Sequence, residues 1–165
     1  MRFSLYEQPA GKRPQGNCVV YDLGNGRAVV WELDEYGGDG ALLSIEVELD
    51  PATEWLMRHD RVDFPPGGVA YRHTHPGPGI RYLLFGSLRI DSHGRTYGPG
   101  EAWFEGAGDP VLATASETEK SAFVRVLLLP REWEGKRTIR YLDPADEEKP
   151  KLQRATIFLE QPISL

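Results

Sequence analysis

The sequence predicts an all-β fold of the sandwich or barrel kind, and three observations support this prediction. The chain of 165 residues contains 18 glycines and 13 prolines, which divide it into many short segments. Several of these segments alternate apolar and polar residues, as in Ile45, Val47 and Leu49 against Glu46 and Glu48, a period typical of half-buried strands. Turn residues separate the segments at short intervals, which favours a sandwich or barrel over a helical fold.

The expected strands are rich in β-branched and aromatic residues and end at turn residues. The longest apolar segment covers 122–129, and the segment 55–64 places Arg58 and Asp60 on one face with apolar neighbours. The break at 65–68, Pro-Pro-Gly-Gly, separates two strands. In chain order we expect strands over 28–33, 41–49, 55–64, 69–75, 80–85, 87–91, 101–105, 111–115, 122–129, 138–142 and 155–159.

The length of the chain suits one domain with a substantial core. We therefore expect a single domain over 1–165, with a barrel core at about 28–129. Residues 1–27 carry turn signals and are expected to form an N-terminal arm. Residues 130–165 are expected to form a C-terminal extension with a last strand. Both terminal segments are suited to exchange with a partner, so we predict a homodimer.

Composition argues against several classes of partner. The formal net charge is −6, and an acidic surface does not attract nucleic acid. The sequence contains no apolar run of about 18 residues, so no membrane span is expected. The first residues lack the apolar core of a signal peptide, and the only cysteine, Cys18, has no disulfide partner in the chain. These features predict a cytoplasmic protein.

A pair of closely spaced histidines marks a candidate site. His73 and His75 are separated by one residue in a predicted strand, so their side chains share one face, with Tyr71 beside them. Two imidazoles on one face can bind a first-row transition metal when neighbouring strands complete the ligand shell.

The segments around these histidines resemble the two motifs of the cupin superfamily. Residues 68–86 resemble the first motif, with His-x-His followed by Pro-Gly-Pro-Gly and a closing glycine. Residues 99–111 resemble the second motif, which begins here with Pro-Gly-Glu. The resemblance implies a cupin, jelly-roll-like β-barrel with its working site in the interior.

The chain departs from the family pattern at two metal-ligand positions. Gly79 occupies the position of the family's glutamate, and Val111 occupies that of its second-motif histidine. In the family register Arg81 enters the barrel near the histidines, and a buried guanidinium needs an anion. That anion is either Glu105 or a carboxylate of the substrate, and both alternatives remain open from the sequence.

Two functions are consistent with these residues. The first is a metal-dependent enzyme acting on a small anionic molecule, with Fe, Mn, Ni, Cu or Zn held by His73 and His75. Cupin resemblance implies an oxygenase, isomerase, lyase or cyclase, in which Arg81, Glu105 and Tyr71 are the candidate catalytic residues. The second function is a non-catalytic or metal-free binding protein, which the two missing ligand positions favour. His59, on a neighbouring strand, is a further candidate for the site.

Overall fold

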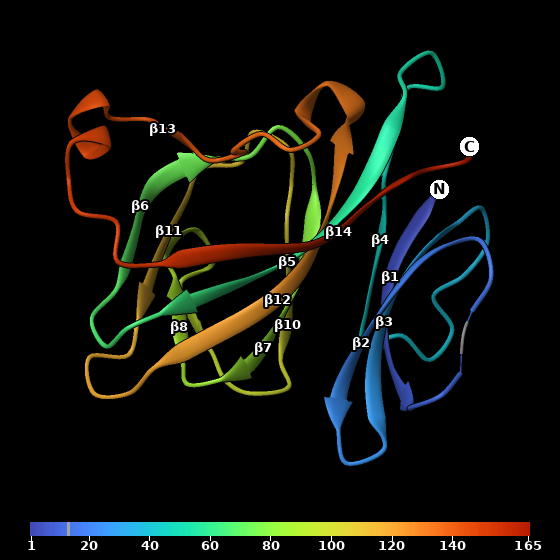
Figure 1. The fold of residues 1–165 in the computed structure, drawn as a ribbon, viewed down its shortest axis with the longest axis horizontal. Helices are drawn as coiled ribbons and strands as arrows, with labels where there is room; N and C mark the ends of the chain where they lie inside the picture. The colour runs from blue at the N-terminus through green and yellow to red at the C-terminus, as the bar shows by residue number, and fades with distance from the viewer. Residues whose placement is uncertain (13) are drawn as a thin grey trace.

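The protein is described by a computed structural model that covers residues 1–12 and 14–165. Its strands form three antiparallel sheets, one of four strands and two of five (Figure 1). The four-stranded sheet lies to one side, and the two five-stranded sheets form the barrel. The observed architecture confirms the predicted all-β, jelly-roll-like fold.

The N-terminal sheet has the strand order β2-β3-β1-β4. Its strands are β1 (Arg2–Pro9), β2 (Asn17–Gly24), β3 (Arg27–Asp34) and β4 (Leu43–Glu46). Residues 1–27, expected as an arm, thus supply two eight-residue strands. The difference arises because β1 pairs with β3, some twenty-five residues further on, with Leu5 opposite Trp31. A local pattern does not reveal such a distant pairing.

The first barrel sheet has the order β10-β7-β12-β5-β14. Its strands are β5 (Trp55–Phe64), β7 (Gly79–Phe85), β10 (Ala102–Glu105), β12 (Ser121–Pro130) and β14 (Arg154–Pro162). The C-terminal strand β14 therefore returns to the barrel and pairs with β5 along its length (Figure 1).

The second barrel sheet has the order β13-β6-β11-β8-β9. Its strands are β6 (Val69–Thr74), β8 (Leu88–Ile90), β9 (Arg95–Tyr97), β11 (Val111–Ala115) and β13 (Arg140–Tyr141). Three short 3-10 helices lie between strands, at η1 (Asp91–His93), η2 (Arg131–Trp133) and η3 (Pro144–Glu147). The strand predicted over 138–142 is thus shortened to the two residues of β13.

Two apolar clusters hold these layers together. One cluster joins the N-terminal sheet to the outer face of the first barrel sheet and includes Phe3, Trp31 and Val126, all almost completely buried. The Trp31 Nε1–H also donates to the carbonyl of Ile80 at 3.0 Å. The other cluster fills one end of the barrel and includes Phe64 and Phe123. Strand β12 contributes to both clusters, which explains its nearly continuous apolar sequence.

Candidate functional site

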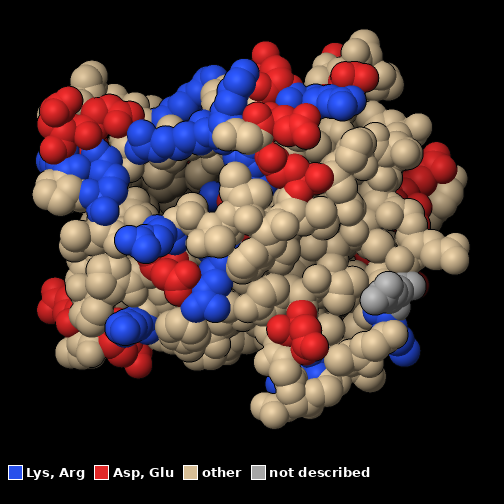
Figure 2. Space-filling view, viewed as in Figure 1, with Lys and Arg blue, Asp and Glu red and all other residues tan. Residues whose placement is uncertain are grey.

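A cavity of about 650 Å³ lies inside the barrel, within the range usual for small-molecule sites. Figure 2 shows a hollow in this face of the molecule with Lys and Arg side chains around it. Along the barrel strands, the side chains that face the cavity are polar toward one end and apolar toward the other. On β5, Arg58 and Asp60 are followed by Val62 and Phe64, and all four line the cavity. The cavity consequently has a polar layer and an apolar floor.

The apolar floor is built from side chains of both barrel sheets. Aromatic rings are prominent in it, and Trp103 packs edge-on against Phe123 with ring centroids 5.4 Å apart. Its members are Val62, Phe64, Ala70, Leu88, Ile90, Trp103, Val111, Ala113 and Phe123. Such a floor accommodates an apolar body and offers ring faces to it.

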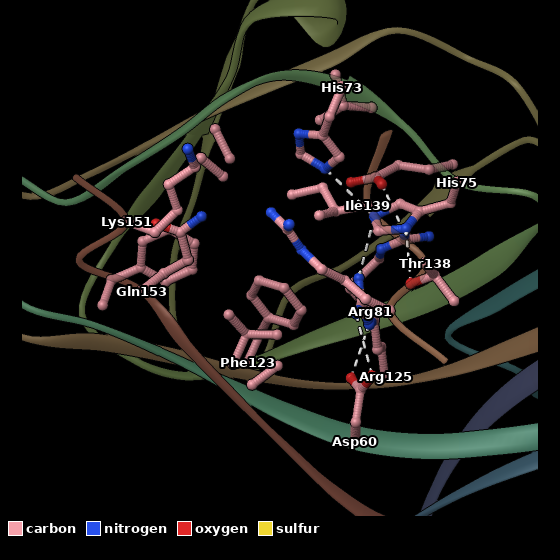
Figure 3. Close-up of a pocket in the computed structure, with 18 of the residues that line it drawn as sticks. Asp60, His73, His75, Arg81, Phe123, Arg125, Thr138, Ile139, Lys151 and Gln153 are labelled. Atoms are coloured by element: carbon pink, nitrogen blue, oxygen red, sulfur yellow. Dashed lines mark hydrogen bonds and ion pairs between the residues drawn. The ribbon is translucent and has the colours of Figure 1, made fainter. Parts of the chain in front are cut away.

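The polar layer begins with a row of charges across three neighbouring strands. Arg125 of β12 lies directly opposite Asp60 of β5 on one side and Arg81 of β7 on the other. Arg125 binds both oxygens of Asp60, with Nε–Oδ1 at 2.7 Å and Nη2–Oδ2 at 3.0 Å (Figure 3). Both side chains are buried, so this two-bond ion pair is shielded from water.

Arg81 is the most deeply buried cation of the layer, with 1% of its surface exposed. Its Nη1–H donates to the Gly79 carbonyl at 2.7 Å, and its Nη2 lies 2.5 Å from Glu105 Oε2. Of the two alternatives that the sequence left open for Arg81, the contact with Glu105 is the one present here, and Trp103 Nε1–H donates to the other Glu105 oxygen at 2.8 Å. Burial lowers the pKa of Arg81 to about 10, although the neighbouring Glu105 carboxylate raises it in part. The guanidinium therefore keeps its charge at neutral pH.

The donor groups of Arg81 are nevertheless not all satisfied. Within the described part of the chain, the buried Nε has no hydrogen-bond partner. Nη2 lies 2.5 Å from Glu105 Oε2, so that carboxylate engages one of its two hydrogens and leaves the other for a ligand. Unsatisfied buried donors cost about 1–3 kcal/mol each, and here they belong to a residue that lines the cavity. Such donors are suited to an anionic group of a ligand.

His73 and His75 lie on the opposite side of the polar layer and face each other. Their Nε2 atoms are 3.2 Å apart, and the rings are nearly perpendicular. His73 Nδ1 lies 2.6 Å from the Tyr71 carbonyl, which can only accept, so this nitrogen carries a proton. Arg125 Nη1 lies 3.2 Å from His75 Nε2 and can only donate, so this nitrogen has a lone pair. The remaining His75 nitrogen, Nδ1, then donates to Thr138 Oγ1 at 3.2 Å.

Both histidines are held in the neutral form. Burial lowers the pKa of His73, and the positive charges of Arg125 and Arg81 lower it further. The hydrogen bond to the Tyr71 carbonyl and the negative charge of Glu105 raise it in part. The pKa of His75 lies well below its usual value, again chiefly because of burial and then because of the two arginines. With Nδ1 protonated, neutral His73 presents an Nε2 lone pair to His75 Nε2. The His75 Nε2 lone pair already accepts from Arg125, so no proton lies between the two Nε2 atoms in this state.

The residues do not fit the metal that the cupin resemblance implies. In 1–12 and 14–165, no three or more His, Cys, Asp or Glu side chains are grouped to hold a metal ion. Asp60 and Glu105 are occupied by arginines, and Arg125 donates into the His75 nitrogen that a metal would need. The family's glutamate has no room at Gly79, where a Cβ atom would lie 2.5 Å from Leu127 Cδ2 and 2.9 Å from the Val126 carbonyl oxygen.

The cavity is electropositive although the chain is acidic overall. Seven cationic side chains and three carboxylates line it, and two further carboxylates, Glu160 and Asp146, pair with Arg58 and Lys149, which leaves an excess of two positive charges in a chain with a net charge of −6. The cations are Arg58, Arg81, Arg125, Lys136, Arg137, Lys149 and Lys151. Four of them come from residues 136–151 of the C-terminal extension, which forms the mouth. A site with this charge attracts anions and raises their local concentration.

Two sequence candidates lie away from the cavity. Strand β6 contains an extra residue relative to β11, because Val111 pairs with His73 whereas Ala113 pairs with Ala70. This bulge breaks the alternation, so Ala70 and His73 line the cavity and Tyr71 does not. The Tyr71 ring instead lies 4.7 Å from Lys149 Nζ.

His59 lies on the opposite face of β5 from Asp60. It packs against Trp31, Tyr21 and Phe158 in the apolar layer outside the barrel. Burial lowers the pKa of this histidine, although its hydrogen bond to the Arg125 carbonyl raises the pKa in part. It therefore supports the fold and does not line the cavity.

The sequence analysis missed Asp60, Arg125 and Thr138 as site residues. The sequence does contain an indication for Arg125, because it is the only charged residue in the apolar strand β12. A charge in such a strand needs a buried partner, and Asp60 supplies it. The sequence contains no such indication for Thr138, because the position of this residue depends on the fold of the C-terminal extension.

Compared with family models and with curated proteins, the sequence gives no match. Two solved structures are similar to it in part. One is the polyketide cyclase RemF from Streptomyces resistomycificus, with 26% identity over 57% of this chain and 64% of that one and a TM-score of 0.41. The other is an oxalate oxidase in complex with the substrate analogue glycolate, with 21% identity over 57% and 52% and a TM-score of 0.42. The similarity spans less than two thirds of either protein.

No helix in the described residues is long and apolar enough to span a membrane. The homodimer and the cytoplasmic location stay predictions.

Proposed function

We propose that this chain binds a small organic carboxylate inside the barrel and acts on it as an acid–base enzyme, without a resident metal. The observation that carries the proposal is the buried guanidinium of Arg81, which lines the cavity with Nε lacking a hydrogen-bond partner in the described structure and with Nη2 engaged by Glu105 through one hydrogen only. A carboxylate accepts from a guanidinium through two oxygens, which suits these donors. The excess positive charge of the lining supports the same class of ligand.

The chemistry follows from the protonation of the histidine pair. His73 is fixed by its Nδ1–H to the Tyr71 carbonyl, so its Nε2 has a lone pair that can accept a proton from a bound molecule. Arg81 places the carboxylate and stabilises negative charge that develops next to it. The cupin resemblance of residues 68–86 and 99–111 supports a site in the barrel interior.

Removing the charge of Arg81 tests the proposal. The double variant Arg81→Met, Glu105→Gln removes both members of the ion pair and so leaves no unpaired buried charge. We expect wild-type protein to bind biphenyl-4-carboxylate in isothermal titration calorimetry, and the double variant to bind it about 10–100-fold more weakly.

Two controls accompany this measurement. The single variant Glu105→Gln keeps Arg81 and is expected to bind the carboxylate at least as well as the wild type. The uncharged probe biphenyl-4-carboxamide is expected to bind wild type and double variant alike. If the double variant, folded by circular dichroism, binds the carboxylate as tightly as the wild type, Arg81 is not the anion site.

A further inference from the structure

A second group of unsatisfied polar atoms lies at the mouth of the cavity. In the described structure, the Tyr141 hydroxyl and Gln153 Oε1 are buried without a hydrogen-bond partner, and both residues line the cavity. The pKa of Tyr141 is raised chiefly by burial, and the side chains of Arg137 and Gln153, which approach the hydroxyl as hydrogen-bonding groups, lower it in part. The Tyr141 hydroxyl and Gln153 are therefore neighbours, but neither the hydroxyl nor Gln153 Oε1 has a well-aligned hydrogen bond.

Lys151 completes this group. Its Nζ lies 4.7 Å from the centre of the Tyr141 ring and donates to the carbonyls of Asp146 and Glu147. An ammonium group has three hydrogens, so one remains for another acceptor. We call Tyr141, Lys151 and Gln153 the mouth subsite.

Two members of the mouth subsite lie across the cavity from the histidine pair. Figure 3 shows Lys151 and Gln153 across the cavity from His75 and Thr138, with Phe123 along the wall between them. Tyr141 lies nearer the polar layer, opposite His73 in the strand pairing, with the two rings 6.3 Å apart. A ligand that reaches from Arg81 toward Lys151 and Gln153 therefore lies beside Phe123 of the apolar floor.

The chemistry of the mouth subsite selects one type of group. Tyr141 and Lys151 have hydrogens to donate, whereas Gln153 Oε1 can only accept. A second carboxylate would satisfy the donors and leave Gln153 Oε1 without a partner. A hydroxyl group both accepts from Tyr141 or Lys151 and donates to Gln153, so it satisfies all of these atoms.

We infer that the ligand is a hydroxyaryl carboxylate, with its carboxylate at Arg81, its ring on the apolar floor and its hydroxyl group at the mouth subsite. The aromatic side chains of the floor favour a ring as the body of the ligand. This inference rests on the proposed carboxylate site and adds the hydroxyl group and its position.

The test compares three probes that differ at one position: biphenyl-4-carboxylate and its 4′-hydroxy and 4′-methoxy derivatives. We expect wild-type protein to bind the hydroxy probe about tenfold more tightly than the unsubstituted one. The methoxy probe, which cannot donate to Gln153, is expected to show no such gain. The variant Tyr141→Phe keeps the ring beside His73 and Lys151 and is expected to lose most of the hydroxyl gain, measured as the ratio of the dissociation constants of the unsubstituted and hydroxy probes.

The outcomes separate this inference from the proposed function. If the hydroxy and unsubstituted carboxylates bind the wild type equally well, the mouth subsite is overturned while the carboxylate site stands. If the gain persists in Tyr141→Phe, the hydroxyl group does not lie at Tyr141 and the inference fails. If none of the three carboxylates binds, the proposed function fails, and the inference fails with it.

Discussion

Replacing Asp60 with asparagine is expected to destabilise the fold by about 3–5 kcal/mol, because it leaves the buried charge of Arg125 without its counterion. Arg125 uses two nitrogens on Asp60, and neither residue is open to water. Arg81 lies beside Arg125 in the strand pairing, so the loss of one carboxylate also increases the repulsion between two like charges. Urea unfolding at neutral pH, followed by circular dichroism, measures the difference.

The neighbouring Asp63 provides a matched control for this prediction. It lies on the same strand and accepts hydrogen bonds from Arg61, but its side chain is 45% exposed. The variant Asp63→Asn is expected to cost less than about 1 kcal/mol, as surface ion pairs do. Equal and small losses in the two variants would mean that Asp60 does not neutralise a buried Arg125.

The second large effect is expected from Val111→His, which supplies the third imidazole that the site lacks. Val111 is buried, lines the cavity and lies directly opposite His73 in the pairing of β11 with β6. Three imidazoles are a sufficient protein ligand set for Zn²⁺ or Co²⁺. We expect the variant to bind these ions about 100-fold or more tightly than the wild type.

Cobalt absorption in the visible range and calorimetric titration with Zn²⁺ measure this gain. Val111→Leu serves as the steric control and is expected to behave as the wild type. If the wild type already binds one ion per chain as tightly as Val111→His, the two histidines have found other ligands and our account of the donor set is wrong.

The fold could be predicted from the sequence to a large extent because its signals are local. The bounds of β5 and β11 coincide with the predicted 55–64 and 111–115. The alternation over 55–64 is irregular, and the Pro-Pro-Gly-Gly break at 65–68 fixes the end of that strand. Residues 1–27 were harder to assign, because their strands are stabilised by partners in β3 that local sequence does not indicate.

The sequence predicts site residues only where their relative position is set within one strand. His73 and His75 share a face within a single segment, and the inward position of Arg81 followed from the family register, whereas Glu105 was one of two anions left open as its partner. The Asp60–Arg125 pair depends on how β5 and β12 align, and such a register joins residues 65 positions apart. Tyr71 was misplaced because a single inserted residue in β6 reverses the direction of a side chain.

The central claim is that Arg81 binds a carboxylate without the help of a metal ion. It is tested most directly by titrating biphenyl-4-carboxylate into the protein by calorimetry, before and after exhaustive dialysis against a chelator. We predict binding of one molecule per chain with a dissociation constant that changes by less than about twofold. Loss of binding after dialysis, with recovery on adding a divalent transition metal, would contradict the account.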